Sequence, residues 1–181
     1  MTVATPSSVN DVLEAKLLEA MTMPLPETKA RTLARSGLDR VLAFIQARTA
    51  IAIGPGLSTH HETVELVQSL MKHLDRPSVL DADALNLVAS HPPLRAALVA
   101  RQSATVLTPH GGEFAELAPD LEVDAGRLVA AAALADLASG TGSRRSTSST
   151  RTPTSIRRCR KRTVASTDLR RGSASSPTWR R

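Results

Sequence analysis

Three short polar segments contain the residues best suited to chemistry, and each directly follows a run of apolar residues: Gly54-Pro55-Gly56-Leu57-Ser58, Asp81-Ala82-Asp83-Ala84-Leu85-Asn86 and Thr108-Pro109-His110-Gly111-Gly112-Glu113. Glycines let a backbone approach a ligand closely, and the amides at a helix start favour an anion or a phosphate. Carboxylate oxygens suit Mg²⁺, directly or through water. A histidine between a proline and a glycine pair is well placed to bind a ligand, and Glu113 could face the same ligand as His110.

Each segment also has a purely structural interpretation. The first segment can be an ordinary turn from a strand to a helix. Asp83 can simply cap the next helix, and Asp81 can bond its own loop. Most single histidines are structural or exposed, and we interpret the other four histidines as surface or loop residues: His60, His61, His73 and His91. The order of the segments favours a site, because consecutive strands of a parallel sheet would place all three on one edge.

The elements that must position these segments alternate along the chain. Continuous apolar runs predict strands at residues 2–4, 50–53, 78–80 and 104–107. Apolar residues at helical spacing predict helices at residues 12–21, 33–47, 59–74, 84–89, 93–100 and 124–138, with another helix starting at 113–117. This alternation predicts an α/β fold with a parallel sheet, helices on its faces and ligands at the carboxyl ends of its strands.

Charge divides the chain into two parts. The whole chain carries +6, and residues 140–181 hold eleven Arg and one Lys against the single acid Asp168, which leaves −5 for the first 139 residues. The last 42 residues are rich in Arg, Ser and Thr without periodicity, a composition typical of disorder. We therefore expect a globular domain over residues 1–139 and a disordered basic tail over residues 140–181.

The sequence also bears on compartment. No run of 18 apolar residues and no basic segment followed by an apolar run is present, so we expect neither a membrane span nor a secretion signal. The single cysteine, Cys159, cannot form an internal disulfide. These features favour the cytoplasm.

Taken in order, the three segments resemble the signature segments of the NAD(P)H-hydrate dehydratases. The segment Ala20–Pro26 also resembles family sequence, and the resemblance runs from about Thr2 to about Ser139. It implies a ribokinase-like three-layer sandwich with a mostly parallel sheet, here incomplete at both ends. It also implies an enzyme in which ADP or ATP, with Mg²⁺, phosphorylates the ring hydroxyl of hydrated NADH or NADPH. Phosphate is a better leaving group than hydroxide, and its departure restores the dihydronicotinamide.

The resemblance implies that the hydrated dinucleotide lies along the three segments. The residues expected to shape or contact this site are Gly54, Gly56, Ser58, Asp81, Asp83, Asn86, His110 and Glu113. No residue is assigned to the ADP or ATP site, to catalysis or to a dedicated metal site. Family resemblance also implies a homo-oligomer.

Three departures from the family pattern have consequences. Ser58 stands where the family usually has Gly, which we expect to be tolerated if its φ is ordinary. Earlier strands of the family are lacking, so some substrate contacts should be absent. The family continues into a strand ending in Lys-Gly and a Gly-Thr/Ser-Gly-Asp helix start that supplies the catalytic Asp. Here Gly140-Thr141-Gly142 comes too early and continues with Ser143, and the tail resembles a GC-rich gene translated in a shifted frame.

Other functions remain open on this sequence. One is an inactive relative that keeps part of the dinucleotide cleft, and another is a small-molecule kinase of the same fold, such as a hydroxyethylthiazole kinase. A third is a nucleic-acid binder acting through the basic tail. Trp179 is the only aromatic residue of that tail, so base stacking would be poor, and we expect no specific nucleic-acid partner.

Overall fold

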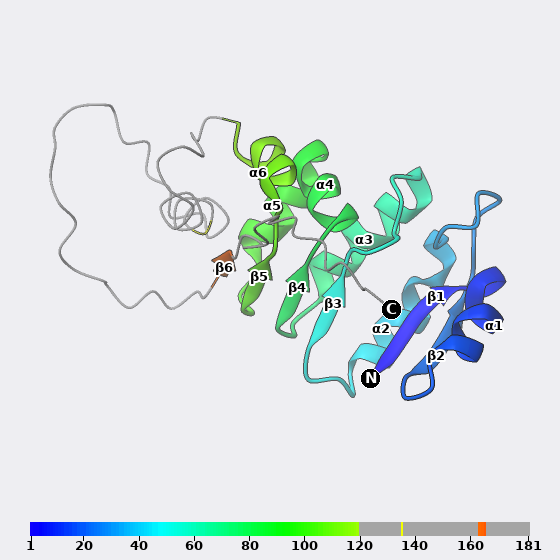
Figure 1. Cartoon of the computed structure of the whole chain (residues 1–181). Coiled ribbons are helices and arrows are strands. Elements are labelled where there is room, and N and C mark those ends of the chain that lie inside the picture. Colours follow the sequence, from blue (N-terminus) through cyan, green and yellow to red (C-terminus); the bar gives the residue numbers. More distant parts are fainter. Residues whose placement is uncertain (120–134, 136–162, 166–181) are drawn as a thin grey trace, which may run out of the picture.

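The strands form two parallel sheets in the computed structural model, which describes residues 1–119, Ala135 and Thr163–Ala165 (Figure 1). The smaller sheet pairs β1 (Thr2–Pro6) with β2 (Met21–Leu25). The larger sheet has the order β3-β4-β5-β6, and its strands span Ile51–Ile53, Ser78–Leu80, Thr105–Leu107 and Thr163–Ala165.

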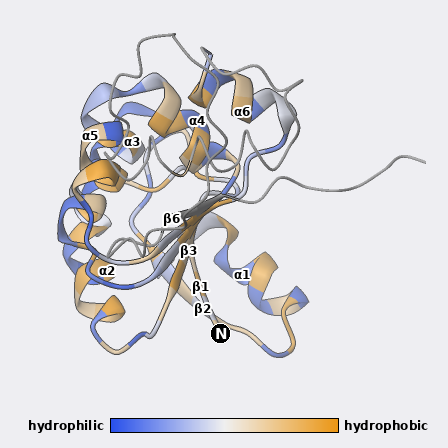
Figure 2. Ribbon diagram, turned by 90° about the vertical axis from the view of Figure 1, so that its left-hand side faces the viewer, coloured by the Kyte–Doolittle hydropathy of each residue, from blue (hydrophilic) through white to orange (hydrophobic). Residues whose placement is uncertain are grey.

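Helices lie on both sides of these sheets. Those within residues 1–119 are α1 (Ser7–Lys16), α2 (Leu38–Ile45), α3 (His61–His73), α4 (Asp83–Ser90), α5 (Pro92–Ala100) and α6 (Gly111–Leu117). Figure 2 shows α2, α3 and α5 on one side and α1 on the other. The predicted α/β architecture with a parallel sheet and layered helices is confirmed. No helix in the described part of the chain is long and apolar enough to cross a membrane.

The strands of the larger sheet end level with one another. Ile53 pairs with Leu80, and Leu80 pairs with Leu107. The polar segments that follow these three residues therefore start from the same edge of the sheet, which confirms the prediction that consecutive strands bring them together.

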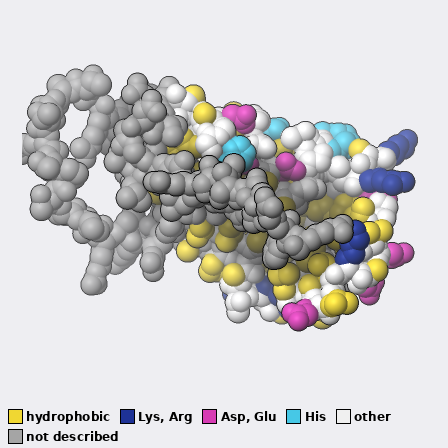
Figure 3. Space-filling view, viewed as in Figure 1, with side chains coloured by type: hydrophobic (Ala, Val, Ile, Leu, Met, Phe, Trp, Pro, Cys, Tyr) yellow, Lys and Arg dark blue, Asp and Glu magenta, His cyan; other side chains and the backbone are white. Residues whose placement is uncertain are grey.

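The core lies between the larger sheet and the helices behind it. Leu80 and Leu107 are each 1% exposed and belong to the same buried cluster as Leu85 of α4 and Phe114 of α6. Val79 is 36% exposed on the opposite face, and Figure 3 shows hydrophobic side chains on that face. In the part of the chain described, the helices thus cover β3–β5 more fully on one face than on the other.

The first helix differs from its prediction. It spans Ser7–Lys16 rather than residues 12–21, and Leu18 is 95% exposed. The backbone N–H of Met21 donates to the carbonyl of Met1, so the chain must already have returned to β1 by that point, and residues 17–20 are needed for the return. The predicted helix at 33–47 is also shorter, because α2 begins at Leu38 after a 3₁₀ turn over Arg35–Gly37.

The expectation of a tail without regular structure is wrong for three residues. Thr163–Ala165 form β6, which pairs in parallel with β5. The β-branched Thr163 and Val164 favour strand geometry, and the outer edge of β5 offers unpaired backbone groups. The rest of the tail and the predicted helix at 124–138, apart from the helical Ala135, lie outside the described residues.

A buried arginine joins elements at the opposite edge of the larger sheet, where its strands begin. Arg101 is 8% exposed, and its guanidinium donates to the carbonyls of Leu74 and Arg76 and to the hydroxyls of Ser78 and Thr105. Burial lowers the pKa of Arg101, and the charge of Asp75 partly opposes this effect. The arginine thereby ties the end of α3 to the starts of β4 and β5.

Candidate functional site

The loop after β3 needs glycine at two positions, for different reasons. Gly54 has φ of 149°, and a Cβ built there would lie 1.7 Å from the carbonyl oxygen of Asp81. Gly56 has φ of 75°, with nothing within 4 Å of a built Cβ. Gly54 is therefore needed for close contact with the loop after β4, whereas Gly56 is needed only for its backbone angle.

Ser58 does not have the ordinary φ that was the condition for serine to be tolerated here. Its φ is 71°, in the left-handed region where a Cβ crowds the backbone and glycine is favoured. This geometry explains why glycine suits the position. Serine adopts this left-handed conformation at a cost of about 1 kcal/mol relative to glycine.

Asp83 holds this strained residue in place. Its Oδ2 accepts a hydrogen bond from the backbone N–H of Ser58 at 2.8 Å, across 25 positions of sequence. Asp83 is the first residue of α4, where a negative charge is stabilised by the helix dipole. The carboxylate therefore joins the loop after β3 to the helix after β4. Asp83 therefore bonds the preceding loop and is not the cap of its own helix, which was the alternative interpretation of this residue.

Asp81 makes the corresponding link to the third loop. Its Oδ1 accepts from the hydroxyl of Thr108 at 2.8 Å, and the backbone N–H of Thr108 donates to the carbonyl of Leu80 at 3.2 Å. The backbone N–H of Asp81 donates to the carbonyl of Ile53 at 3.0 Å. The three loops are thus connected by hydrogen bonds into one rim at the strand ends.

His110 and Glu113 contact each other in a capping box at the start of α6. The backbone N–H groups of Gly112 and Glu113 donate to His110 Nδ1, at 3.0 and 3.3 Å, and the N–H of His110 donates to Glu113 Oε2 at 2.8 Å. His110 Nε2 lies 3.3 Å from Glu113 Oε1. The side chain of His110 is nevertheless 67% exposed, while that of Glu113 is 8% exposed, so the imidazole is the accessible member of the pair.

Asn86 lies one helical turn beyond Asp83 on α4 and is half-buried. Residues three apart share a face of a helix, so Asn86 extends the rim from Asp83. Figure 3 shows His and Asp/Glu side chains along the upper edge, over the ends of β3–β5. The rim therefore combines exposed glycine backbone, an exposed imidazole and a half-buried carboxamide, a set suited to binding a polar, anionic ligand.

One grouping was missed in the sequence, although adjacency alone could have indicated it. Sequence reasoning placed His60 and His61 on the surface, and their half-buried and exposed environments agree with that. His60 also caps α3, since its Nδ1 accepts from the backbone N–H of Glu62 at 3.3 Å. The side chains of His60, His61 and Glu62 gather at this helix start.

Comparison with known proteins decides the family. A family model described as NAD(P)H-hydrate dehydratase matches residues 1–141. The chain belongs to the NAD(P)H-hydrate dehydratase family. The relatives of this dehydratase-family chain include a bifunctional NAD(P)H-hydrate repair enzyme of Moorella thermoacetica, 44% identical over 117 residues, which are 65% of the chain and 22% of that enzyme.

Two further relatives agree with this assignment, and one solved structure has a similar fold. A bifunctional NAD(P)H-hydrate repair enzyme of Thermofilum pendens is 35% identical over 73% of the chain and 25% of its own length. An ATP-dependent (S)-NAD(P)H-hydrate dehydratase of Ajellomyces capsulatus is 40% identical over 56% of the chain and 26% of its length. The crystal structure of the hypothetical protein SMU.573 from Streptococcus mutans has a similar fold, with a TM-score of 0.52 and 23% identity over 73% of this chain and 44% of that one. The dehydratase-family chain thus spans about a quarter or less of these curated relatives.

Proposed function

We propose that this chain provides the substrate-facing rim of an NAD(P)H-hydrate dehydratase that uses ADP or ATP. The observation that carries the proposal is the hydrogen-bonded rim itself: three family segments leave one sheet edge at the same level and are joined through Asp81 and Asp83. The name of the Ajellomyces capsulatus relative specifies ATP and the hydrate of NAD(P)H for that protein. The proposed reaction transfers a phosphoryl group to the ring hydroxyl; phosphate and a proton from the adjacent ring carbon then leave, which restores the double bond of the dihydronicotinamide.

The rim residues have two different roles in this proposal. Gly54, Asp81, Asp83 and Glu113 are positioning residues, because their polar atoms or their lack of a side chain fix the loops. The residues that face the hydrated dinucleotide are the exposed Gly56, the half-buried Ser58 and Asn86, and His110 with its exposed ring.

Mg²⁺ accompanies the phosphoryl donor in this proposal, where it would neutralise phosphate charge. Asp81 and Asp83 each accept a protein hydrogen bond through one carboxylate oxygen. A carboxylate has about four acceptor sites, so both side chains can also accept hydrogen bonds from water bound to Mg²⁺. We also propose that the chain acts in the cytoplasm as a homo-oligomer.

We further propose that the chain binds the hydrated dinucleotide without efficient turnover. Residues 1–181 do not contain the Gly-Thr/Ser-Gly-Asp segment that the family resemblance implies, so these residues supply neither its amides nor its Asp for phosphoryl transfer. The test incubates the full chain with hydrated NADH, Mg²⁺ and ADP or ATP and follows dihydronicotinamide absorbance alongside equilibrium binding. We expect binding without recovery of absorbance. Turnover at about 1 per second or faster, an ordinary enzyme rate, would overturn the claim of inactivity.

Substitution of His110 by Asn separates ligand contact from folding. Asn is a favoured N-cap residue, so His110→Asn keeps the start of α6 but removes the imidazole. We expect the variant to bind hydrated NADH up to about tenfold more weakly, the loss of one polar contact. His73→Asn is the matched control, because His73 is an exposed histidine at the far end of α3. Equal binding by both variants, or no binding by the unmodified chain, contradicts the proposed site.

A further inference from the structure

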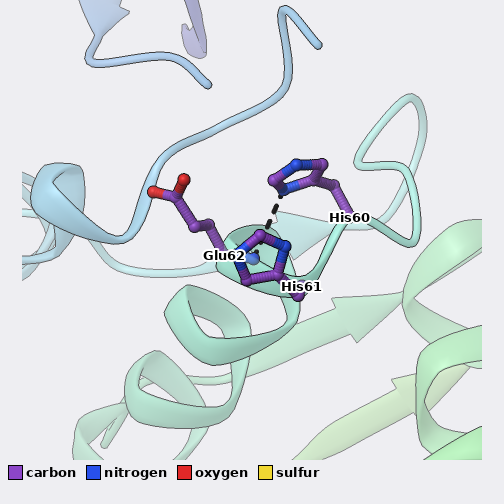
Figure 4. Close-up of side chains that lie close together, drawn as sticks. All are labelled: His60, His61 and Glu62. Atoms are coloured by element: carbon purple, nitrogen blue, oxygen red, sulfur yellow. Dashed lines mark hydrogen bonds between the residues drawn. The ribbon is translucent and has the colours of Figure 1, made fainter. Parts of the chain in front are cut away.

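Three metal-ligating side chains meet at the start of α3, beside the rim but outside it. His60, His61 and Glu62 each offer a ligand atom, and these atoms all lie within 4.8 Å of one another. The two imidazole rings are 4.4 Å apart between centroids (Figure 4). No other grouping of three such residues was found in the described part of the chain.

The backbone explains how His60 can join the two helical residues that follow it. Within a regular helix, successive side chains diverge by about 100°, which would separate adjacent ligands. His60 is outside the helix, with extended φ and ψ of −61° and 138°. Its ring therefore turns back over that of His61, the first helical residue. The extended N-cap creates the cluster, and the cluster would not survive if α3 began one turn earlier.

We propose that His60, His61 and Glu62 form a binding site for a divalent transition metal ion of the Zn²⁺ and Ni²⁺ class. Imidazole nitrogen suits these ions, whereas Mg²⁺ prefers oxygen ligands. Two imidazoles and a carboxylate leave one position of a tetrahedral zinc ion open to water. The site is thus chemically distinct from the Mg²⁺ of the proposed dehydratase reaction and does not depend on that reaction.

The distances require only a modest rearrangement. Metal–ligand bonds of about 2.0–2.2 Å place the ligand atoms of a tetrahedral ion about 3.3–3.6 Å apart. The distances between the ligand atoms, which are at most 4.8 Å, must therefore decrease by up to about 1.2–1.5 Å. His61 is exposed, so its side chain can rotate toward the other two without disturbing the core.

Metal binding must compete with the helix cap. His60 Nδ1 accepts from the N–H of Glu62, and a neutral imidazole carries one proton. A metal on Nδ1 takes the accepting lone pair, and a metal on Nε2 forces the proton onto Nδ1, so either mode ends the cap. Loss of one N-cap bond lowers affinity by a factor of about 2 to 30. The negative charge of Glu62 offsets the unfavourable placement of a cation at a helix N-terminus.

The test is a titration of the full, untagged chain with Zn²⁺ or Ni²⁺ by calorimetry, repeated in excess Mg²⁺. We expect one ion per chain, unaffected by Mg²⁺, and at least tenfold weaker binding in His61→Ala and His60→Asn. Asn preserves the cap, so the second variant keeps α3 intact. His73→Ala is the control and should bind like the unmodified chain. Equal affinity of His61→Ala and the unmodified chain, equal losses in His61→Ala and His73→Ala, or displacement by Mg²⁺ would each overturn the proposal.

Discussion

At the scale of single residues, the rim depends on backbone angles more than on the chemistry of its side chains. Gly54 lets two loops touch, and Ser58 holds a left-handed angle with the help of Asp83. The backbone angles of both residues therefore depend on contacts with the neighbouring loop. Two substitutions test this directly.

Ser58→Gly should stabilise the chain. Glycine removes the cost of a left-handed φ but gains entropy when unfolded, so we expect a net increase of up to about 0.5 kcal/mol in the free energy of unfolding. Thr59→Gly is the control, because Thr59 is exposed and is not among the described residues with positive φ. It should destabilise the chain. Urea denaturation measures both, and a less stable Ser58→Gly variant would show that the serine side chain has a stabilising contact.

Gly54→Ala should be far more damaging than Gly56→Ala. The first places a Cβ against the carbonyl of Asp81, whereas the second meets no atom. We expect a cost of about 3 kcal/mol or more for the first, from overpacking and strain, and about 1–2 kcal/mol for the second. Denaturant unfolding of the pair gives the comparison. Equal costs would mean that the loops after β3 and β4 do not touch.

At the scale of elements, links between distant parts of the chain fix the helix and strand ends. Arg101 joins the end of α3 to β4 and β5 through four hydrogen-bond acceptors. Glu27 reaches back to the first turn of α1, where its Oε2 accepts from the N–H of Ser8 at 2.9 Å. Neither link is visible in the periodicity of the sequence.

Arg101→Lys should destabilise the fold despite keeping the charge. Lysine cannot reproduce the planar fork of donors, so buried acceptors lose their partners. We expect a cost of about 2–4 kcal/mol. Arg95→Lys is the matched control, because Arg95 makes one hydrogen bond to the carbonyl of Leu117 and is half-buried. Its cost should be about 1 kcal/mol. Thermal or urea unfolding that ranks the variants equally would contradict this role for Arg101.

Glu27→Gln should remove a pH-dependent part of the stability. Hydrogen bonds from Ser8, first from its side chain and then from its backbone, lower the pKa of Glu27 below 4.5. Because the folded pKa is the lower one, the stabilisation is present above pH 4.5 and is lost as pH falls through the folded pKa. The stability difference between the unmodified chain and Glu27→Gln should therefore shrink below pH 4.5. A difference that is constant between pH 3 and 7 would contradict this prediction.

The helices and strands were predictable wherever the local pattern of apolar residues determines them. The apolar runs before the three polar segments correctly indicated β3, β4 and β5, and their order indicated a shared sheet edge. Residues 7–20 were misplaced because the parallel pairing of β1 and β2, a long-range contact, sets where α1 must end. The strand at Thr163–Ala165 was missed because its partner, β5, lies far away in the sequence.

The candidate site was predictable in its residues but not in their roles. Residue type indicated Asp81, Asp83 and His110, and each lies at the strand-end rim. Their hydrogen-bond partners depend on distances between loops, which spacing along the chain does not determine. The same limit hid the positive φ of Ser58, since nothing local in the sequence requires it.

At the scale of the whole molecule, the chain combines a family domain with a strongly basic end. Residues 1–141 match the family model, and residues 140–181 carry +11. β6 covers the edge of β5, while Val79, on the sheet face that the described helices cover less, is 36% exposed. Exposed apolar sheet surface favours association with other chains, in keeping with the proposed oligomer.

Binding of the hydrated dinucleotide to the strand-end rim underlies the proposed function. Amide hydrogen exchange of the full chain, with and without hydrated NADH, tests it most directly. We expect slower exchange at Gly54–Ser58, Asp81–Asn86 and His110–Glu113, with no change at residues 72–76 and 100–103 on the opposite edge. Protection confined to that opposite edge, or no protection at a saturating concentration, would contradict it.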